Sequence, residues 1–363
     1  MSEALKERFR EKLHALGFSE VRFAPVGEAT PEAASRFHRW LAEDQHADMH
    51  WLAKNPERRM DPRKVLETTS SVVVVGAQYQ ESPFANHQPT PVIARYARYT
   101  DYHETIGKPL REACHWLEKQ LHLPPRSLRA YTDTGPVFER GWAARAGLGF
   151  QGKNGMLISR QHGNWLILGV FLIPYPFSPD PLPDRLREPG EDPPLAEYCG
   201  TCTRCLTACP TGAIKEPGLV DARLCLSYQT IENRGSIPLE LRRPMGYRLF
   251  GCDDCLEVCP WNKFAQKGHS RLLEARPLIT SLGLLGFLRL DRDTYVQLFR
   301  KSPLKRAKLE GLWRNAAVVA GNFLRHEPHH PDVPAIKEAL AQLAQTPNEM
   351  VAEHARWALA QEG

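Results

Sequence analysis

The stretch Cys199-Gly-Thr-Cys202-Thr-Arg-Cys205-Leu-Thr-Ala-Cys209-Pro210 has the cysteine spacing C-x₂-C-x₂-C-x₃-C-P. Farther along, the chain passes Cys225 and reaches a second run, Cys252-Asp-Asp-Cys255-Leu-Glu-Val-Cys259-Pro260. The first run has the ligand spacing of bacterial ferredoxins, in which three thiolates bind one [4Fe–4S] cluster and the fourth binds the neighbouring cluster. The segment from 199 to 260 therefore predicts a ferredoxin-like domain with two [4Fe–4S] clusters.

The same pattern assigns the cysteines to two clusters. The first cluster takes Cys199, Cys202, Cys205 and Cys259. The second takes Cys209, Cys252 and Cys255 and is one ligand short, because the second run reads C-x₂-C-x₃-C-P. Cys225, alone between the runs, is the residue that can complete it. The ninth cysteine, Cys114, lies in a predicted helix and is expected to be a buried thiol.

Two other kinds of cysteine site fit this segment less well. Zinc sites use paired spacings such as C-x₂-C…C-x₂-C, and a tight triplet followed by Cys-Pro suits one face of a cluster better than a tetrahedron. A disulfide framework is typical of short secreted chains.

Composition places the cysteine segment inside a larger protein. The chain has 363 residues, of which 25% are charged and 42% apolar, as in a globular protein of two or three domains. Its start is charged, and its longest apolar run, from Trp165 to Ile173, is far shorter than a membrane span. We therefore expect a cytoplasmic chain. The net charge of +5 is compatible with a polyanionic partner.

Before the cysteine segment, the hydrophobic pattern alternates between helical and strand spacing. It predicts helices over residues 5–16, 40–59, 107–121 and 137–146, and strands over 21–24, 71–79, 128–132, 155–159 and 165–173. The β-branched run from Ser71 to Tyr79 is continuous, which is typical of a strand covered on both faces. Interleaved helices and strands predict an α/β or α+β first domain, and an α+β fold for the whole chain.

A glycine-rich stretch in this part imitates two phosphate-binding motifs. Gly147-Leu-Gly149-Phe-Gln-Gly152 matches G-x-G-x-x-G, and with Lys153 it nearly matches the phosphate loop of nucleotide-binding proteins. Both motifs must follow a strand and open a helix, whereas this stretch follows a predicted helix and precedes a predicted strand. We therefore expect it to bind neither a nicotinamide cofactor nor ATP.

Proline marks the first domain boundary. Eight of the residues from Pro174 to Pro194 are proline, which predicts a stiff linker or a crossover between domains. The predicted domains are residues 1–190, the ferredoxin-like segment 191–268 and a helical domain 269–363.

The last domain is predicted to consist of helices over residues 294–300, 303–324, 333–344 and 348–361, whose alanine-rich apolar faces suggest stacked hairpins of the HEAT kind. The stretch from Arg300 to Arg325 contains seven Lys or Arg residues and a single acidic residue, Glu310. They are Arg300, Lys301, Lys305, Arg306, Lys308, Arg314 and Arg325. Such a run is either a solvated helix face or, if the substrate is a nucleic acid, a contact surface for phosphates.

Together with the cluster motif, four long motifs carry a resemblance to a known family. They are Asp133-Thr-Gly-Pro-Val-Phe-Glu-Arg140, Gly147-Leu-Gly-Phe-Gln-Gly-Lys-Asn154, Tyr228-Gln-Thr-Ile-Glu-Asn-Arg-Gly-Ser-Ile-Pro238 and Gly251-Cys-Asp-Asp-Cys…Cys-Pro-Trp-Asn-Lys-Phe264. Over nearly its whole length the chain closely resembles the tRNA epoxyqueuosine reductases. This resemblance implies a cobalamin-binding first domain, two [4Fe–4S] clusters, and reduction of epoxyqueuosine to queuosine at the wobble position of tRNA.

The resemblance also implies partners and site residues. The substrates would be tRNAs with a GUN anticodon (Tyr, His, Asn, Asp), and an external low-potential donor would supply electrons to a monomeric enzyme with no membrane partner. The catalytic aspartate falls on Asp133, which follows a predicted strand. A carboxyl held in partly dry surroundings under a corrin would have its pKa raised and could donate a proton near neutral pH.

The corrin contacts implied by similarity, besides Asp133, are Arg58, Tyr96, Lys153, Asn154, Ser159, Ser227 and Asp253. The stretch Asp101-Tyr-His103-Glu-Thr-Ile-Gly107 is one residue too long for the cobalt-binding motif D-x-H-x-x-G, so a base-off cobalamin without a histidine ligand from this motif is expected.

Three other classes of protein account for fewer of these features. A cobalamin-dependent reductive dehalogenase shares the cofactors but is usually exported. A simple electron carrier would not need the remaining domains. A tRNA-binding module without catalytic activity would not need clusters.

Overall fold

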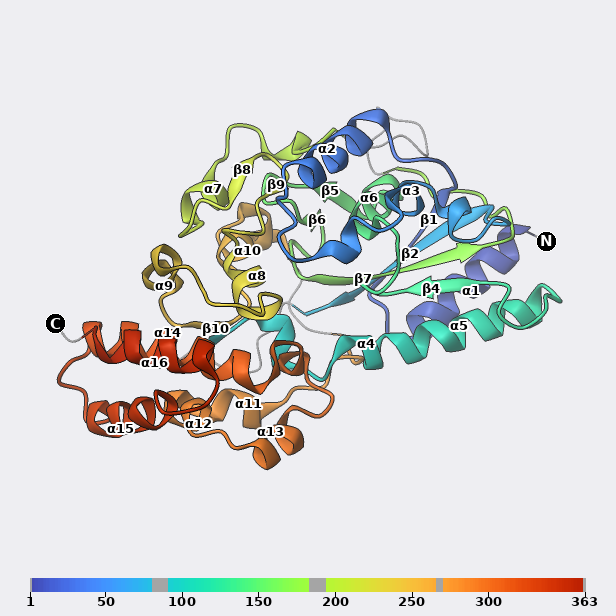
Figure 1. The fold of residues 1–363 in the computed structure, drawn as a ribbon. Coiled ribbons are helices and arrows are strands. Elements are labelled where there is room, and N and C mark those ends of the chain that lie inside the picture. Colours follow the sequence, from blue (N-terminus) through green and yellow to red (C-terminus); the bar gives the residue numbers. More distant parts are fainter. Residues whose placement is uncertain (1, 80–90, 183–193, 266–269, 362–363) are drawn as a thin grey trace.

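A computed structural model describes residues 2–79, 91–182, 194–265 and 270–361 (Figure 1). Its helices are α1 Ser2–Leu16, α2 Pro31–Ala42, α3 Pro56–Met60, α4 Tyr102–Thr105, α5 Gly107–Gln120, α6 Glu139–Arg145, α7 Arg204–Ala208, α8 Leu226–Ile231, α9 Leu239–Met245, α10 Asp254–Glu257, α11 Pro277–Ser281, α12 Gly283–Leu288, α13 Arg292–Phe299, α14 Lys308–His326, α15 Val333–Leu343 and α16 Glu349–Leu359. Its strands are β1 Glu20–Pro25, β2 Ser71–Gln78, β3 Val92–Ile93, β4 Arg129–Tyr131, β5 Gly149–Gln151, β6 Leu157–Ser159, β7 Leu166–Ile173, β8 Ile214–Glu216, β9 Leu219–Val220 and β10 Arg248–Phe250. Short 3₁₀ turns include η1 His50–Leu52, η3 Arg95–Arg98, η4 Glu197–Cys199, η5 Pro260–Phe264 and η6 Pro303–Ala307.

A four-stranded sheet organises the first half of the chain. Its strands lie in the order β1-β2-β7-β4, and each neighbouring pair is antiparallel. Every residue of β2 is buried, and its side chains alternate between two cores. Val73 and Val75 point to the core shared with α1 and α5, whereas Val72 and Val74 point to the core shared with α6. Figure 1 shows these helices on opposite faces of the sheet. A strand covered on both faces needs no polar alternation, which explains its continuous β-branched sequence.

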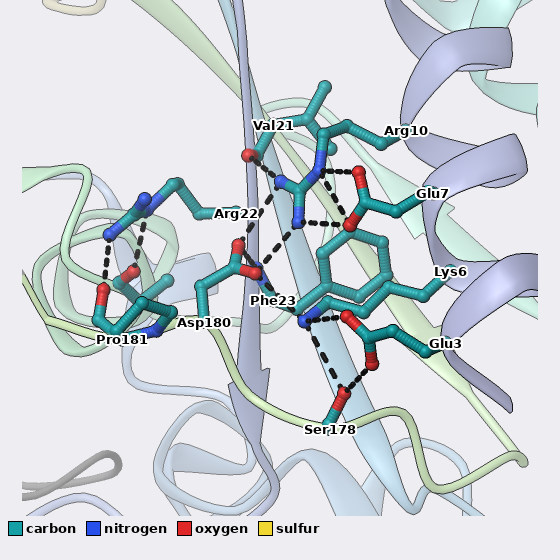
Figure 2. A network of polar contacts seen from close by, with 11 residues as sticks. Glu3, Lys6, Glu7, Arg10, Val21, Arg22, Phe23, Ser178, Asp180 and Pro181 are labelled. Carbon is teal, nitrogen blue, oxygen red and sulfur yellow. Dashed lines mark hydrogen bonds and ion pairs between the residues drawn. The ribbon is translucent and has the colours of Figure 1, made fainter.

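Asp180 fixes the segment that leaves β7 to the start of the chain (Figure 2). Its carboxylate accepts hydrogen bonds from the Phe23 N–H (3.0 Å) and from two guanidinium nitrogens of Arg10 (2.7 and 3.1 Å), and Lys6 Nζ lies 3.0 Å away. Burial by itself would raise the pKa of Asp180, but these donors outweigh it and lower the pKa. Phe177 is buried in the adjacent core. The described part of the proline-rich segment is therefore packed against the first domain and is not a free linker.

A second body combines the cysteine segment with the C-terminal helices. One hydrophobic core runs from Leu226 in α8 through Phe250 in β10 to residues of α12, α14, α15 and α16. Part of the N-terminal half joins it, because β3 pairs in parallel with β10 and Ile93 is buried in this core. Helix α14 packs against α16, and α15 packs against α16, in the manner of stacked hairpins.

Buried side chains of α14 provide hydrogen bonds to the backbone between the two cysteine runs. Arg314 is 1% exposed and donates to the carbonyl oxygens of Gln229 (2.6 Å), Asn233 (2.8 Å) and Gly235 (2.7 Å). The amide nitrogen of Asn315 donates to the carbonyl oxygens of Thr230 (2.8 Å) and Leu249 (2.9 Å). These bonds supply partners for carbonyl groups that lie away from water.

The mixed architecture confirms the expected α+β fold, although several elements differ from the sequence prediction. The helix expected over 40–59 is interrupted, because Asp44, Ala47 and Asn55 have positive φ angles (53°, 50° and 49°) that no helix tolerates. The short helices α11 and α12 were not expected. The proposed domain boundaries stay predictions, since the residues around 190 and 268 lie outside the described ranges. No helix within the described residues is both long and apolar enough to cross a membrane.

Candidate active site and cluster segment

One group of four cysteines lines a cavity of about 130 Å³. Its members are Cys199, Cys202, Cys205 and Cys259. The hairpin of β5 and β6 closes one side of this cavity, because Lys153 Nζ donates to the carbonyl oxygens of Gly200 (2.7 Å) and Cys202 (3.0 Å). Four thiols around one cavity are the donor set that a [4Fe–4S] cluster requires.

The other four cysteines of the predicted sites form a second group. They are Cys209, Cys225, Cys252 and Cys255. Burial raises the pKa of Cys255, and the charges of the other three thiols, all nearby, raise it further. Cys225 precedes α8, and the N–H groups of Ser227 and Tyr228 point at its sulfur. The structure thus brings together the same two groups of four that the spacing suggests. Within the described residues, no group of three or more His, Cys, Asp or Glu side chains has the geometry to bind a single metal ion.

Asp133 lies in the loop that follows β4, and its backbone and side chain are both held. Its φ angle is 61°, in the left-handed region that non-glycine residues rarely adopt. The Tyr102 hydroxyl donates to Asp133 Oδ2 (2.7 Å), and the Asp133 N–H donates to Glu139 Oε1 (2.7 Å). His103 Nε2 lies 3.8 Å from the same Oδ2. The side chain of Asp133 is 68% exposed, so the described protein residues do not provide the dry surroundings expected for it.

The carboxyl with the raised pKa is instead Glu139, at the start of α6. Burial raises its pKa to about 8, and the charge of Asp133 acts in the same direction, whereas Arg140 and Arg59 act against it. Burial lowers the pKa of both arginines, although Asp133 and Glu139 favour their charged forms. Burial also raises the pKa of Tyr102, and the neighbouring Asp133 raises it further. Asp133 is therefore surrounded by two cations, a phenol and a second carboxyl.

Two of the expected corrin contacts, Tyr96 and Asp253, lie near Asp133, and a third, Arg58, lies near the end of β4. Burial raises the pKa of Tyr96, and the charges of Asp253 and Asp133 add to this effect, so all three groups are near one another. Arg58 is exposed on α3, and its charge acts on Tyr131 at the end of β4. These contacts stay predictions, but their positions are compatible with one ligand that spans the space above the Asp133 loop.

The other four expected corrin contacts already have protein partners. Lys153 binds the loop of the first cysteine group, as described above. The side-chain amide of Asn154 donates to Asn164 Oδ1 (2.9 Å) and to the Cys255 carbonyl oxygen (3.2 Å). The Ser159 hydroxyl, which is buried, accepts from two backbone N–H groups at the end of its hairpin. Ser227 points its N–H at Cys225. Lys153, Asn154 and Ser227 bond to the cysteine segment, whereas Ser159 bonds within its own hairpin, and direct contact with a corrin stays a prediction for each.

The structure divides the basic run of the C-terminal domain. Arg314 is buried and bonded to backbone carbonyl groups, so its assignment to a phosphate-binding face is wrong. Arg306 forms an ion pair with Glu232 (2.7 Å), and Lys305 lies 3.3 Å from Asp101 Oδ2. The interpretation as a contact surface for phosphates therefore holds at most for the exposed members of the run.

Another cavity does not include Asp133 in its lining. It has a volume of about 870 Å³ and is an open cleft between the loop after β1 and helix α3. Glu57, Met60 and Asp61 line it, whereas Arg59 of the same helix lies near Asp133. The large cleft and the Asp133 site thus share α3 but no titratable group.

The sequence interpretation missed several residues that surround Asp133. Glu139 and Arg140 belong to the same motif as Asp133, and that motif could have indicated them. Tyr102 lies in the stretch that was examined only as a cobalt-binding motif. Arg59 is adjacent to the named Arg58, and only the turn of α3 decides which side chain lies near the aspartate.

Comparison with known proteins gives a consistent result over the whole chain. Residues 198–262 match the family model of the 4Fe-4S double cluster binding domain, and residues 59–134 match the model described as epoxyqueuosine reductase QueG, DUF1730. An epoxyqueuosine reductase of Xanthomonas campestris is 35% identical over 98% of this chain and 96% of its own length. One from Synechocystis is 41% identical over 81% of this chain and 97% of its own length.

Solved structures agree with the sequence comparisons. A crystal structure of epoxyqueuosine reductase with an epoxyqueuosine-modified tRNA-Tyr stem loop has a TM-score of 0.85 and 25% identity, and it covers 99% of this chain and 91% of that chain. A Bacillus subtilis epoxyqueuosine reductase whose catalytic aspartate loop is swung out of the active site has a TM-score of 0.77 and 24% identity, and covers the full length of both chains. With identity above a third over nearly its entire length, the chain belongs to the epoxyqueuosine reductase family.

Proposed function

We propose that this protein reduces epoxyqueuosine in tRNA to queuosine, with Asp133 as the proton donor. The reaction removes the epoxide oxygen as water and consumes two electrons and two protons. The observation that carries the proposal is the position of Asp133, which lies among Tyr102, Glu139, Arg59 and Arg140.

Asp253 supports a short path from the second cysteine group to the Asp133 site. It stands between Cys252 and Cys255, and its Oδ2 accepts the Arg95 N–H (2.7 Å). Its charge acts on Tyr96, whose ring contacts the Tyr102 ring edge to face with centroids 6.0 Å apart. Tyr102 in turn donates to Asp133. The family match to a double [4Fe–4S] domain supports these cysteines as ligands of clusters that carry single electrons.

The residues around Asp133 also fit a bound cobalamin. Arg59 Nε is buried and has no hydrogen-bond partner among the described residues, so this donor is available to a ligand. Tyr96 from η3 and Asp253 from the cysteine segment lie near the same space, and Arg58 lies on α3 near Tyr131. When bound, cobalamin would supply a strongly reducing cobalt centre, a property that no side chain offers.

The chain's own residues would then orient the substrate and supply the proton. Protonated Asp133 donates a proton to the leaving epoxide oxygen, and Tyr102 hydrogen-bonds the carboxylate that remains. Glu139 fixes the backbone of Asp133 in its left-handed conformation through the bond to its N–H. The exposure of Asp133 leaves its second oxygen accessible to the substrate.

The remaining features of the proposal concern partners. Substrates are tRNAs with a GUN anticodon, an external low-potential donor supplies the electrons, and the enzyme works as a monomer in the cytoplasm, where its tRNA substrates are. Family membership leaves no observation that favours the alternative, a reductive dehalogenase.

The test uses anaerobically prepared holoprotein and an epoxyqueuosine-containing anticodon stem loop, with the loss of one oxygen atom followed by mass spectrometry. The parent should convert the substrate, and Asp133→Asn should keep its cofactors yet lose roughly 10²-fold or more in rate, as when a general acid is removed. Asp293→Asn, at an exposed aspartate of α13, is the control and should match the parent. An active Asp133→Asn enzyme would assign the proton to another donor.

A further inference from the structure

Trp51 is an exposed aromatic residue at a junction of three segments. Among the large apolar side chains of the described residues it is one of few in the exposed class, with 42% of its surface accessible. It lies in η1, and its carbonyl oxygen accepts a hydrogen bond from Arg59 (3.4 Å). Arg306 of η6 holds its guanidinium carbon 5.4 Å from the centre of the Trp51 ring. Trp51 is therefore held by Arg59 at its backbone and by Arg306 at its ring, yet its indole remains open to solvent.

Arg306 is itself fixed by an acid from the cysteine segment. Its Nε and Nη2 donate to the carboxylate of Glu232, at distances from 2.7 to 3.0 Å. This pairing occupies the Nε and Nη2 edge of the guanidinium, while its carbon stays over the indole ring. An exposed ion pair of this kind adds little to stability. Stability therefore gives no strong reason for joining Trp51, Arg306 and Glu232 at this place.

The junction borders the Asp133 site. Lys305, the neighbour of Arg306, lies 3.3 Å from Asp101 Oδ2. Asp101 Oδ1 lies 2.8 Å from His103 Nδ1, and His103 Nε2 lies 3.8 Å from Asp133 Oδ2, so η6 is connected to the proposed proton donor through two side chains. Arg59 connects Trp51 with the Asp133 site, because it donates a hydrogen bond to the Trp51 carbonyl oxygen and because the charge of Asp133 favours its charged form. A nucleotide whose base reaches Asp133 would thus bring its neighbour in the chain close to the indole.

Exposed aromatic rings and arginine planes are the surfaces on which proteins stack the unpaired bases of RNA loops. We propose that Trp51, held by Arg306, stacks the base next to the wobble nucleotide and thereby holds the anticodon loop open at the active site. The inference rests on the proposed function, because it needs an RNA substrate at Asp133. Stacking accepts any base, so this contact would provide affinity and position but little sequence selectivity.

The test measures binding of fluorescent anticodon stem loops to holoprotein by anisotropy. Trp51→Ala should raise the Kd on the order of 10- to 100-fold, the range seen when a stacked base loses its ring partner. Trp51→Phe should recover most of the affinity, and Trp51→Leu, which keeps apolar volume without an aromatic face, should not. Phe264→Ala is the matched control, since Phe264 is also exposed (55%) and also has a cation, Lys263, over its ring.

An abasic stem loop identifies the partner of the ring. Removing the base on one side of the wobble position should weaken binding to the parent as much as Trp51→Ala does, and should cost the Trp51→Ala variant nothing more. Unchanged stem-loop affinity of Trp51→Ala, or full additivity with both abasic probes, would overturn the proposal. So would a loss of bound cobalamin in Trp51→Ala with RNA affinity intact. A parent that binds the stem loop but fails to reduce epoxyqueuosine would refute the proposed function instead.

Discussion

Replacing Glu139 by glutamine should change how the stability of the protein depends on pH. The folded protein holds the pKa of this carboxyl at about 8, against an ordinary value of 4.5. An unfolded chain therefore loses this proton at a lower pH than the folded chain does. Unfolding releases a proton between these two values, so the parent loses stability as the pH rises from 4.5 to 8, and the contribution is constant outside this window.

The size of the effect follows from the shift. Each pKa unit corresponds to about 1.36 kcal/mol, so the cost of keeping Glu139 in the folded protein grows by about 2 kcal/mol between pH 6 and pH 8. Glutamine cannot ionise, and its amide oxygen can still accept the Asp133 N–H. Relative to the parent, Glu139→Gln should therefore gain about 2 kcal/mol over this interval, or roughly 3 °C in Tm for a chain of 363 residues.

Thermal unfolding of anaerobic holoprotein, followed by circular dichroism at pH 6, 7 and 8, measures this difference. Asp133→Asn provides a second arm, because the Asp133 charge contributes to the raised pKa of Glu139 and its removal should reduce the pH dependence. If the Tm values of the parent and Glu139→Gln change in parallel with pH, the assignment of a raised pKa to Glu139 is wrong.

Two further predictions concern the cysteine segment and the start of the chain. Cys225→Ser should lower the iron content of anaerobic protein from about eight towards about four atoms per chain, whereas Cys114→Ser should leave it unchanged; equal iron in all three proteins would remove Cys225 from the ligand set. Asp180→Ala should destabilise the protein by roughly 3–5 kcal/mol, because it leaves Arg10 and Lys6 uncompensated, whereas Glu7→Ala at an exposed position should cost about 1 kcal/mol or less. Since the pKa of Asp180 is lowered from 3.8, this stability is present above about pH 4 and is lost as the pH falls further. Denaturant titrations at pH 7 and pH 3 should show the unfolding free energies of the parent and Asp180→Ala converge at acid pH. A difference that stays constant with pH would contradict the ion pairing.

The parts of the fold that could be predicted are those with local periodicity or fixed spacing. The buried run of β2 identified a strand covered on both faces because its side chains alternate between two apolar cores. The cysteine spacing indicated both groups of four, because each [4Fe–4S] cluster needs four thiolates and Cys225 is the only cysteine between the two runs. The interruption between α2 and α3 was not predictable in the same way. Positive φ angles at Asp44 and Ala47 depend on packing against the cysteine segment, where the Gln45 carbonyl oxygen accepts the Ala222 N–H.

The surroundings of Asp133 were only partly predictable for a similar reason. A motif identifies the aspartate, but the burial that raises the pKa of Glu139 depends on segments far apart in the sequence. Charge counting also failed for Arg314, because a cation on a helix can serve buried carbonyl groups as well as phosphates. Composition gives the number of charges in a segment, and only the tertiary structure decides which of them face water.

The hydrogen bonds from α14 into the cysteine segment set an order for the maturation of this protein. Every cysteine of both groups leaves the ribosome before Arg314 and Asn315 are synthesised, so during that interval the carbonyl groups of Gln229, Thr230 and Leu249 lack these partners. Burying a carbonyl group without a partner costs about 1–3 kcal/mol, which prevents α8 and β10 from reaching their final packing early. We expect metal insertion into the second cysteine group to be stable only after the C-terminus has been released, so a chain that stalls before α14 would emerge with its thiols unprotected against oxygen.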